Sequence, residues 1–167
     1  MATAPTLVQA HRPPGAGTWC SLTGAVIVVL GVVMPWMRTT IAAREQVVTG
    51  VQGAGPWRAE GWALIGASVV AALACGPALL GIHRARANAV QVVAALVMGA
   101  FAALAWAGTN HRIGRLSQVG RAAGMGTVAE RGPGLVVVGI GALAVAIGGV
   151  AGLTGTVASA GAHRRSS

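Results

Sequence analysis

The chain has 167 residues, of which 54% are apolar and 9% are charged, whereas about 25% of the residues in a typical soluble domain are charged. A soluble protein of this composition could not cover its long apolar blocks with polar surface. The hydrophobicity is also far too high for a disordered chain. A soluble enzyme or binding domain is therefore nearly excluded, and an integral membrane protein remains.

The net charge of +9 comes from 12 arginines and three glutamates, with no lysine. Every arginine lies in a terminus or a connection, and none lies inside an apolar block. A nucleic-acid surface would instead gather basic and aromatic side chains on one face. The arginines flank the apolar blocks, at the depth where lipid headgroups would lie. We therefore expect them to bind anionic lipid and not nucleic acid.

Four apolar segments reach the length of about 20 residues that a membrane-spanning helix needs. None of them contains Lys, Arg, Asp or Glu. Hydrocarbon offers no hydrogen-bond partners, so the backbone of each segment has to be helical. We expect spans at residues 19–37, 61–82, 89–107 and 133–157. The predicted fold is all-α, an up-down bundle of four transmembrane helices in a single membrane domain over residues 1–167.

The first span also has some features of a cleaved signal peptide. A polar leader with one arginine precedes its apolar core, and Ile41-Ala42-Ala43 follows it. The apolar core is long for a signal peptide, which favours retention of the segment as a span.

The connections between the spans differ in length. Residues 83–88 form a short turn that forces an antiparallel hairpin, with Asn88 as a candidate N-cap. Residues 38–60 and 108–132 are long loops. In the first loop the alternation over residues 46–53 suggests a short β-hairpin. The second loop has room for one turn of helix around residues 113–119.

A shift of the sequence by 70 residues places Trp36 on Trp106 and Glu60 on Glu130, among eight identities in 39 positions. One interpretation is a helical hairpin duplicated in tandem. The other is chance combined with the usual composition of membrane edges, where Trp ends a span and Glu begins a helix. Both interpretations stay open, and either makes these four residues candidates for the interface and loop regions.

Glycines recur every seven residues in two of the spans, a spacing that keeps them on one helix face. Small residues let membrane helices approach closely, so we expect these rows to pack the bundle. The alternative is that one row faces a second subunit, which would make the chain a homo-oligomer. The candidate packing residues are Gly24 and Gly31 in the first span and Gly134, Gly141, Gly148 and Gly155 in the fourth.

The spans lack the ionisable side chains that ion-coupled transporters and proton relays use. Polar residues such as Ser21, Ser68 and Gln91 are expected to bond the backbone of their own helices, and Cys20 and Cys75 to be buried as small apolar groups. No spacing of side chains predicts a catalytic site, a cofactor site or a metal site.

The first predicted span ends in Met34-Pro35-Trp36, and the second opens at Gly61-Trp62 after a glycine-rich loop. This pattern, over residues 33–64, resembles small four-helix membrane proteins of high-GC actinobacteria that are called Trp-associated conserved membrane proteins. The resemblance implies a four-span fold and brings no catalytic residues with it.

These features favour a non-enzymatic multi-pass protein of the bacterial plasma membrane, acting as an accessory or assembly partner. Its two termini and its short arginine-rich turn are expected in the cytoplasm, because all three glutamates and four of the five tryptophans lie on the side of the long loops. Two alternatives stay open. One is binding or transport of a lipid or hydrophobic small molecule between the two hairpins, and the other is a holin-like protein that permeabilises the membrane.

Overall fold

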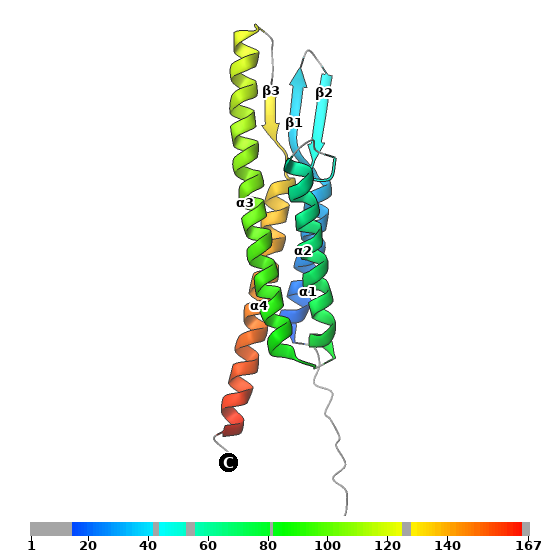
Figure 1. The fold of residues 1–167 in the computed structure, drawn as a ribbon, viewed down its shortest axis with the longest axis vertical. Coiled ribbons are helices and arrows are strands. Elements are labelled where there is room, and N and C mark those ends of the chain that lie inside the picture. Colours follow the sequence, from blue (N-terminus) through cyan, green and yellow to red (C-terminus); the bar gives the residue numbers. More distant parts are fainter. Residues whose placement is uncertain (1–14, 42–43, 53–55, 81, 125–127, 165–167) are drawn as a thin grey trace, which may run out of the picture.

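The computed structural model describes residues 15–41, 44–52, 56–80, 82–124 and 128–164. It contains four long helices that run alternately up and down (Figure 1). Each contains a stretch long and apolar enough to cross a membrane, which confirms the prediction of four long apolar helices in a bundle. The helices are α1 (Ala16–Val33), α2 (Pro56–Leu79), α3 (Arg84–Ala122) and α4 (Gly134–Arg164).

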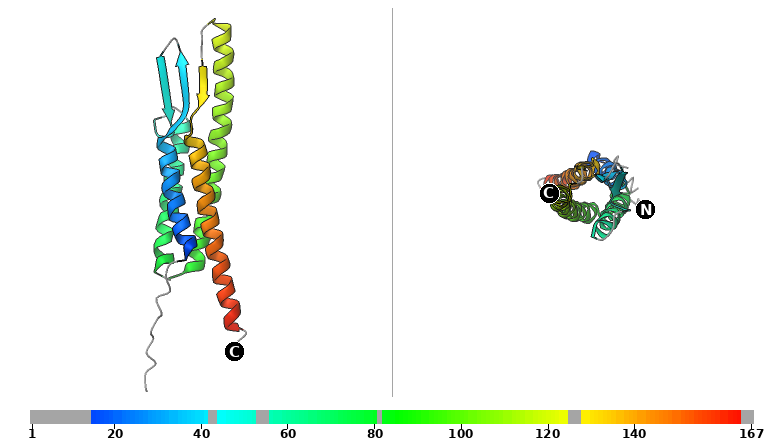
Figure 2. Two further views of the ribbon diagram at one scale, coloured as in Figure 1. Left: turned by 180° about the vertical axis from the view of Figure 1, so that it is seen from behind. Right: turned by 90° about the horizontal axis from the view of Figure 1, so that it is seen from above.

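The four helices surround a common axis, so that each one packs against its two neighbours in the chain and α4 closes the ring against α1 (Figure 2). The contact between α1 and α4 is the most extensive in the molecule. The short connection between α2 and α3 lies at the end where α1 begins and α4 ends, and we call it the turn end.

A three-stranded antiparallel sheet covers the opposite end, the sheet end, which corrects the expectation of an all-α fold. Its strands are β1 (Pro35–Ile41), β2 (Arg44–Thr49) and β3 (Val128–Arg131), in the order β2-β1-β3. The sequence predicts a β-hairpin within residues 46–53. Only β2 reaches into that range, and it pairs with β1, which precedes it in the chain, so the hairpin lies further upstream than predicted. The third strand comes from the second long connection, so the sheet joins the two connections to each other.

The first helix ends earlier than the predicted span, which reached residue 37. Its last helical residue is Val33, and Met34 has extended backbone angles. Proline disfavours helical geometry in the residue before it and has no N–H to continue the ladder, so Pro35 stops the helix. Trp36 and Met37 therefore belong to β1.

The third helix is much longer than the predicted span of residues 89–107. It begins at Arg84 and continues to Ala122, so the predicted loop at residues 108–132 is helical over most of its length. Asn88, the candidate N-cap, lies inside this helix, and His83 is its N-cap. Thirty-nine helical residues extend about 58 Å, nearly twice the thickness of a bilayer's hydrocarbon core of about 30 Å. The upper part of α3 stands beside β3 (Figure 1).

The interior of the bundle is mainly apolar, and so are large parts of its outer surface. Val28, Leu64, Met98 and Val145 are fully buried in the core. Large side chains on the outer faces of the helices are exposed, among them Leu73 (70%), Leu96 (69%) and Leu143 (62%). Soluble monomers rarely expose apolar patches of this extent, whereas hydrocarbon solvates such side chains well.

Candidate functional site

The glycine rows of α1 and α4 face each other within one chain. A methyl group added to Gly24 would lie 2.7 Å from the Gly141 carbonyl oxygen, and one added to Gly141 would lie 2.7 Å from the Gly24 carbonyl oxygen. Gly31 and Gly134 approach each other in the same way, at 2.9 and 2.7 Å. These distances are shorter than any side chain tolerates, so the backbones of α1 and α4 can meet only because these positions carry no Cβ.

The row continues toward the turn end. A methyl group on Gly17 would lie 2.7 Å from the Gly148 carbonyl oxygen. The two helices are antiparallel, and the glycines recur every seven residues in both. Each glycine of the α1 row therefore faces a glycine of the α4 row. Gly155 belongs to α4, but its surroundings lie outside the residues whose side chains the structure describes.

A buried set of polar side chains lies in the half of the bundle nearer the turn end. Ser21 of α1 donates a hydrogen bond of 2.9 Å to Gln91 Oε1 of α3, across the bundle, and is 3.3 Å from the Val145 carbonyl oxygen of α4. Gln91 Nε2 in turn donates to the Cys75 sulfur of α2 at 3.3 Å. Ser21 and Gln91 are completely buried. One hydrogen-bonded chain therefore links all four helices.

Asn88 extends this set toward α4. It is 4% exposed, and its side-chain amide lies directly against Gly152, where a methyl group would meet it. A methyl group on Gly149 would meet Val92 of α3 at 2.9 Å and the Asn88 carbonyl oxygen at 3.3 Å. The glycines of α4 thus make room for a polar side chain of α3 as well as for the backbone of α1.

The sequence missed the role of these residues. Ser68 bonds the Leu64 carbonyl oxygen of its own helix at 2.8 Å, as expected, but Ser21 and Gln91 bond across the bundle. A glutamine in an otherwise apolar span was the available signal, because a buried amide needs partners that its own helix backbone does not offer. The side chains that would satisfy it come from other helices and could not be named from the sequence.

The two tryptophans matched by the 70-residue shift lie in different surroundings. Trp36 is fully buried at the sheet end, where its indole N–H donates to the Gly31 carbonyl oxygen at 3.1 Å. Trp106 is 38% exposed on α3, and the Arg131 guanidinium lies over its ring, 4.7 Å from the ring centre. The duplicated hairpin stays a prediction, since the equivalent segments are a β-hairpin in one half and a helix in the other.

The matched glutamates also differ. Glu130 is exposed on β3. Glu60 lies near the start of α2 and is half-buried, within electrostatic range of Arg112 on α3. Its Oε2 atom is a buried side-chain oxygen without a hydrogen-bond partner among the described residues. The structure therefore brings Glu60 to the junction of α2 and α3, and Glu130 to the surface.

The sheet and the upper part of α3, residues 108–122, form one layer at the sheet end, which we call the sheet layer. The strand β2 is at its edge, and residues 44–47 of this strand are exposed. Arginines outnumber glutamates among the exposed charged side chains of the layer. They are Arg38, Arg44, Arg115, Arg121 and Arg131, against Glu45 and Glu130.

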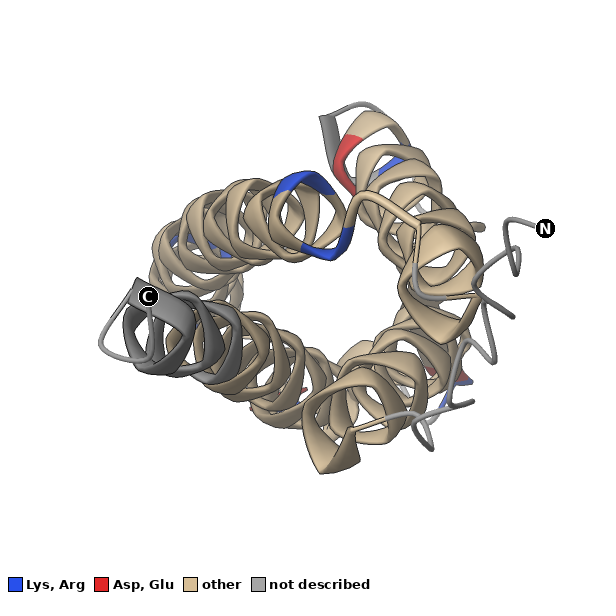
Figure 3. Ribbon diagram, turned by 90° about the horizontal axis from the view of Figure 1, so that it is seen from below, with Lys and Arg blue, Asp and Glu red and all other residues tan. Residues whose placement is uncertain are grey.

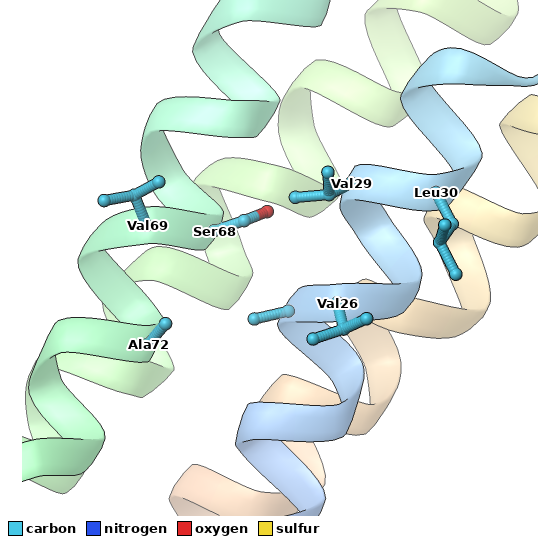
Figure 4. Close-up of a pocket in the computed structure, with 7 residues that line it drawn as sticks. Val26, Val29, Leu30, Ser68, Val69 and Ala72 are labelled. Atoms are coloured by element: carbon cyan, nitrogen blue, oxygen red, sulfur yellow. The ribbon is translucent and has the colours of Figure 1, made fainter.

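Two grooves open between neighbouring helices. One has a volume of about 220 Å³ between α1 and α2 and is lined by apolar side chains such as Val26, Val29 and Val69 (Figure 4). Its single polar lining residue, Ser68, points from α2 toward α1, and its hydroxyl already bonds its own helix. The second groove, of about 300 Å³, lies between α2 and α3 near the turn end.

Within the described part of the chain, no three His, Cys, Asp or Glu side chains come together as a metal site would require. The two cysteines are free thiols, Cys75 buried and Cys20 half-buried. Comparison of the sequence with known protein families and with curated proteins finds no match in either.

Proposed function

We propose that this chain is a non-enzymatic multi-pass protein of the bacterial plasma membrane that serves as an accessory or assembly partner. In this proposal the four helices cross the bilayer, the turn end faces the cytoplasm, and the sheet layer stands outside. The apolar outer faces of the helices support the membrane location. The parts of the helices within the bilayer, residues 16–33, 61–79, 87–107 and 134–154, contain no Lys, Arg, Asp or Glu.

The main support for partner binding is the unpaired edge of β2. The strand is paired with β1 on one side only, and its residues 44–47 are exposed. An edge strand presents unpaired N–H and C=O groups that can accept a further strand from another chain. The sheet is tied to the bundle below it, since β1 follows α1 after one residue and the Gly132 N–H donates to the Trp36 carbonyl oxygen at 2.9 Å.

The charge of the sheet layer favours an acidic partner. Its exposed arginines outnumber its exposed glutamates, with Arg38 and Arg44 on the two paired strands. Complementary charge steers association and disfavours wrong partners. We therefore propose that an extended, acidic segment of another envelope protein adds to β2.

Site-specific photocrosslinking in intact cells tests this function. A photoreactive side chain at Val47, 47% exposed on β2, should form a discrete protein adduct, whereas one at Leu73, 70% exposed on the lipid-facing side of α2, should not. Reversal of charge by Arg38→Glu and Arg44→Glu should abolish the adduct, and Arg86→Glu at the turn end should leave it. Equal adducts from Val47 and Leu73, or an adduct that survives the reversal, would contradict the proposal.

A further inference from the structure

The groove between α2 and α3 combines apolar walls with a cationic end. Val70, Ala74 and Pro77 of α2 form one wall, and Ala87 and Val90 of α3 form the other. His83 and Arg86 complete the lining, and both are exposed. A volume of about 300 Å³ is at the small end of ligand pockets, so the groove suits a chain-like apolar group better than a bulky one.

The helix N-terminus at this groove is suited to an anion. His83 precedes α3 in a left-handed conformation, with φ of 48°, and its side chain makes no capping hydrogen bond. The first N–H groups of a helix have no acceptor within the helix, and the helix dipole adds partial positive charge there. Phosphate groups bind at such helix ends, and here the side chains of His83 and Arg86 lie beside the end as well.

No acidic side chain of the chain can neutralise this cluster. The three glutamates, Glu45, Glu60 and Glu130, all lie toward the sheet end, on β2, at the start of α2 and on β3. Seen from below, the turn end shows arginine at the start of α3 (Figure 3). No carboxylate side chain therefore competes with an external anion for Arg84 and Arg86.

We infer that this groove binds one anionic phospholipid. The phosphate lies at the N-terminus of α3 beside His83 and Arg86, and one acyl chain follows the groove along Ala74 and Val90. The groove between α1 and α2 is lined by no charged residue and provides no headgroup site. The inference rests on the proposed membrane location, but it is independent of partner binding at the sheet layer.

Native mass spectrometry of the purified full chain, titrated with phosphatidylglycerol or phosphatidylcholine in detergent, tests the site. Phosphatidylglycerol should bind one molecule per chain in preference to phosphatidylcholine. The double variant His83→Gln/Arg86→Gln should weaken this binding at least about fivefold, because the arginine alone contributes about 1 kcal/mol near a headgroup and about 1.4 kcal/mol corresponds to a factor of ten. The matched control Arg115→Gln/Arg121→Gln removes charge at the sheet end and should leave the affinity unchanged.

A second pair of variants tests the apolar part of the groove. Ala74→Leu fills the groove and should lower phosphatidylglycerol binding, whereas Ala100→Leu adds the same atoms on an exposed face of α3 and should not. Inorganic phosphate should compete only weakly, because it gains nothing from the apolar walls. Equal binding of the two lipids, an equal loss in the Arg115/Arg121 control, or full competition by phosphate would each overturn the inference. The exposed His83 and Arg86 can be replaced without disturbing the core, so the test does not depend on the groove-filling variant.

Discussion

Among the residues whose burial the structure describes, Trp36 is the largest fully buried side chain, and it closes the bundle at the point where α1 ends and β1 begins. Its indole ring packs against Gly50 and Gly134, where an added methyl group would collide with the ring. The hydrogen bond to the Gly31 carbonyl oxygen satisfies the one polar atom of the side chain. This residue therefore holds together the helix end, the turn after β2 and the start of α4.

We expect Trp36→Ala to destabilise the protein by about 3–5 kcal/mol, because it leaves a large cavity in the core. The matched change Trp106→Ala should cost no more than about 1 kcal/mol, since that ring is 38% exposed and loses mainly its contact with Arg131. Unfolding by sodium dodecyl sulfate in mixed micelles measures both. Equal losses would indicate that the two tryptophans occupy equivalent sites after all.

A double-mutant cycle on Ser21 and Gln91 measures the hydrogen bond that crosses the bundle. Hydrogen bonds between membrane helices are worth about 0.6 kcal/mol on average and up to about 1.7, so Ser21→Ala and Gln91→Leu should couple within that range. Each single change should be costlier, because it leaves a buried partner unsatisfied. Thr109→Val is the control, since the Thr109 hydroxyl donates to the Ala105 carbonyl oxygen of its own helix at 2.8 Å. No coupling between Ser21 and Gln91 would contradict the described geometry.

At the scale of elements, the contact between α1 and α4 depends on glycine at particular positions and not on glycine content. Gly139 and Gly141 lie two residues apart on the same helix. A methyl group on Gly141 would meet the α1 backbone at 2.7 Å, whereas one on Gly139 would meet nothing within 4 Å. The two positions form a matched pair within one element.

Gly141→Ala should therefore destabilise the bundle by about 1–3 kcal/mol, the usual cost of overpacking. Gly139→Ala should be neutral or stabilising by up to about 1 kcal/mol, because alanine is the better helix former. The same unfolding titration gives both free energies. If Gly141→Ala proves harmless, then α1 and α4 do not approach as closely as the structure has them.

Much of the helical architecture could be predicted from the sequence, because long apolar segments without charged residues indicate where long helices lie. The full extension of α3 could not, since residues 108–122 contain three glycines and only a short apolar spacing around Ile113 and Leu116, which predicts no more than one turn of helix. Contact with β3 supports this part of the helix, and β3 is a four-residue strand from a later segment. The pairing of β3 with β1 is equally non-local. The hydrogen bond between Ser21 and Gln91 could not be predicted either, because the two residues are 70 positions apart in the sequence.

At the scale of the whole molecule, charge is divided between the two ends and is absent from the middle. The sheet layer contains both signs, the turn end contains arginine and histidine, and the middle presents apolar side chains to its surroundings. A molecule with this distribution has two polar ends separated by an apolar belt. The belt predicts insertion across a bilayer. Arg84 and Arg86 at the turn end have no glutamate near them, which favours contact with anionic headgroups there.

Cysteine accessibility in intact cells tests insertion and orientation together. Val119→Cys in the sheet layer should react with a membrane-impermeant maleimide without permeabilisation, and Ala85→Cys at the turn end should react only after it. Leu104→Cys should stay unreactive in both conditions, although Leu104 is 60% exposed, because hydrocarbon would surround it. The unsubstituted chain, with Cys75 buried and Cys20 half-buried, gives the background. Labelling of Ala85→Cys but not Val119→Cys in intact cells would reverse the orientation, whereas labelling of Leu104→Cys in both conditions would show that water, and not lipid, surrounds the belt.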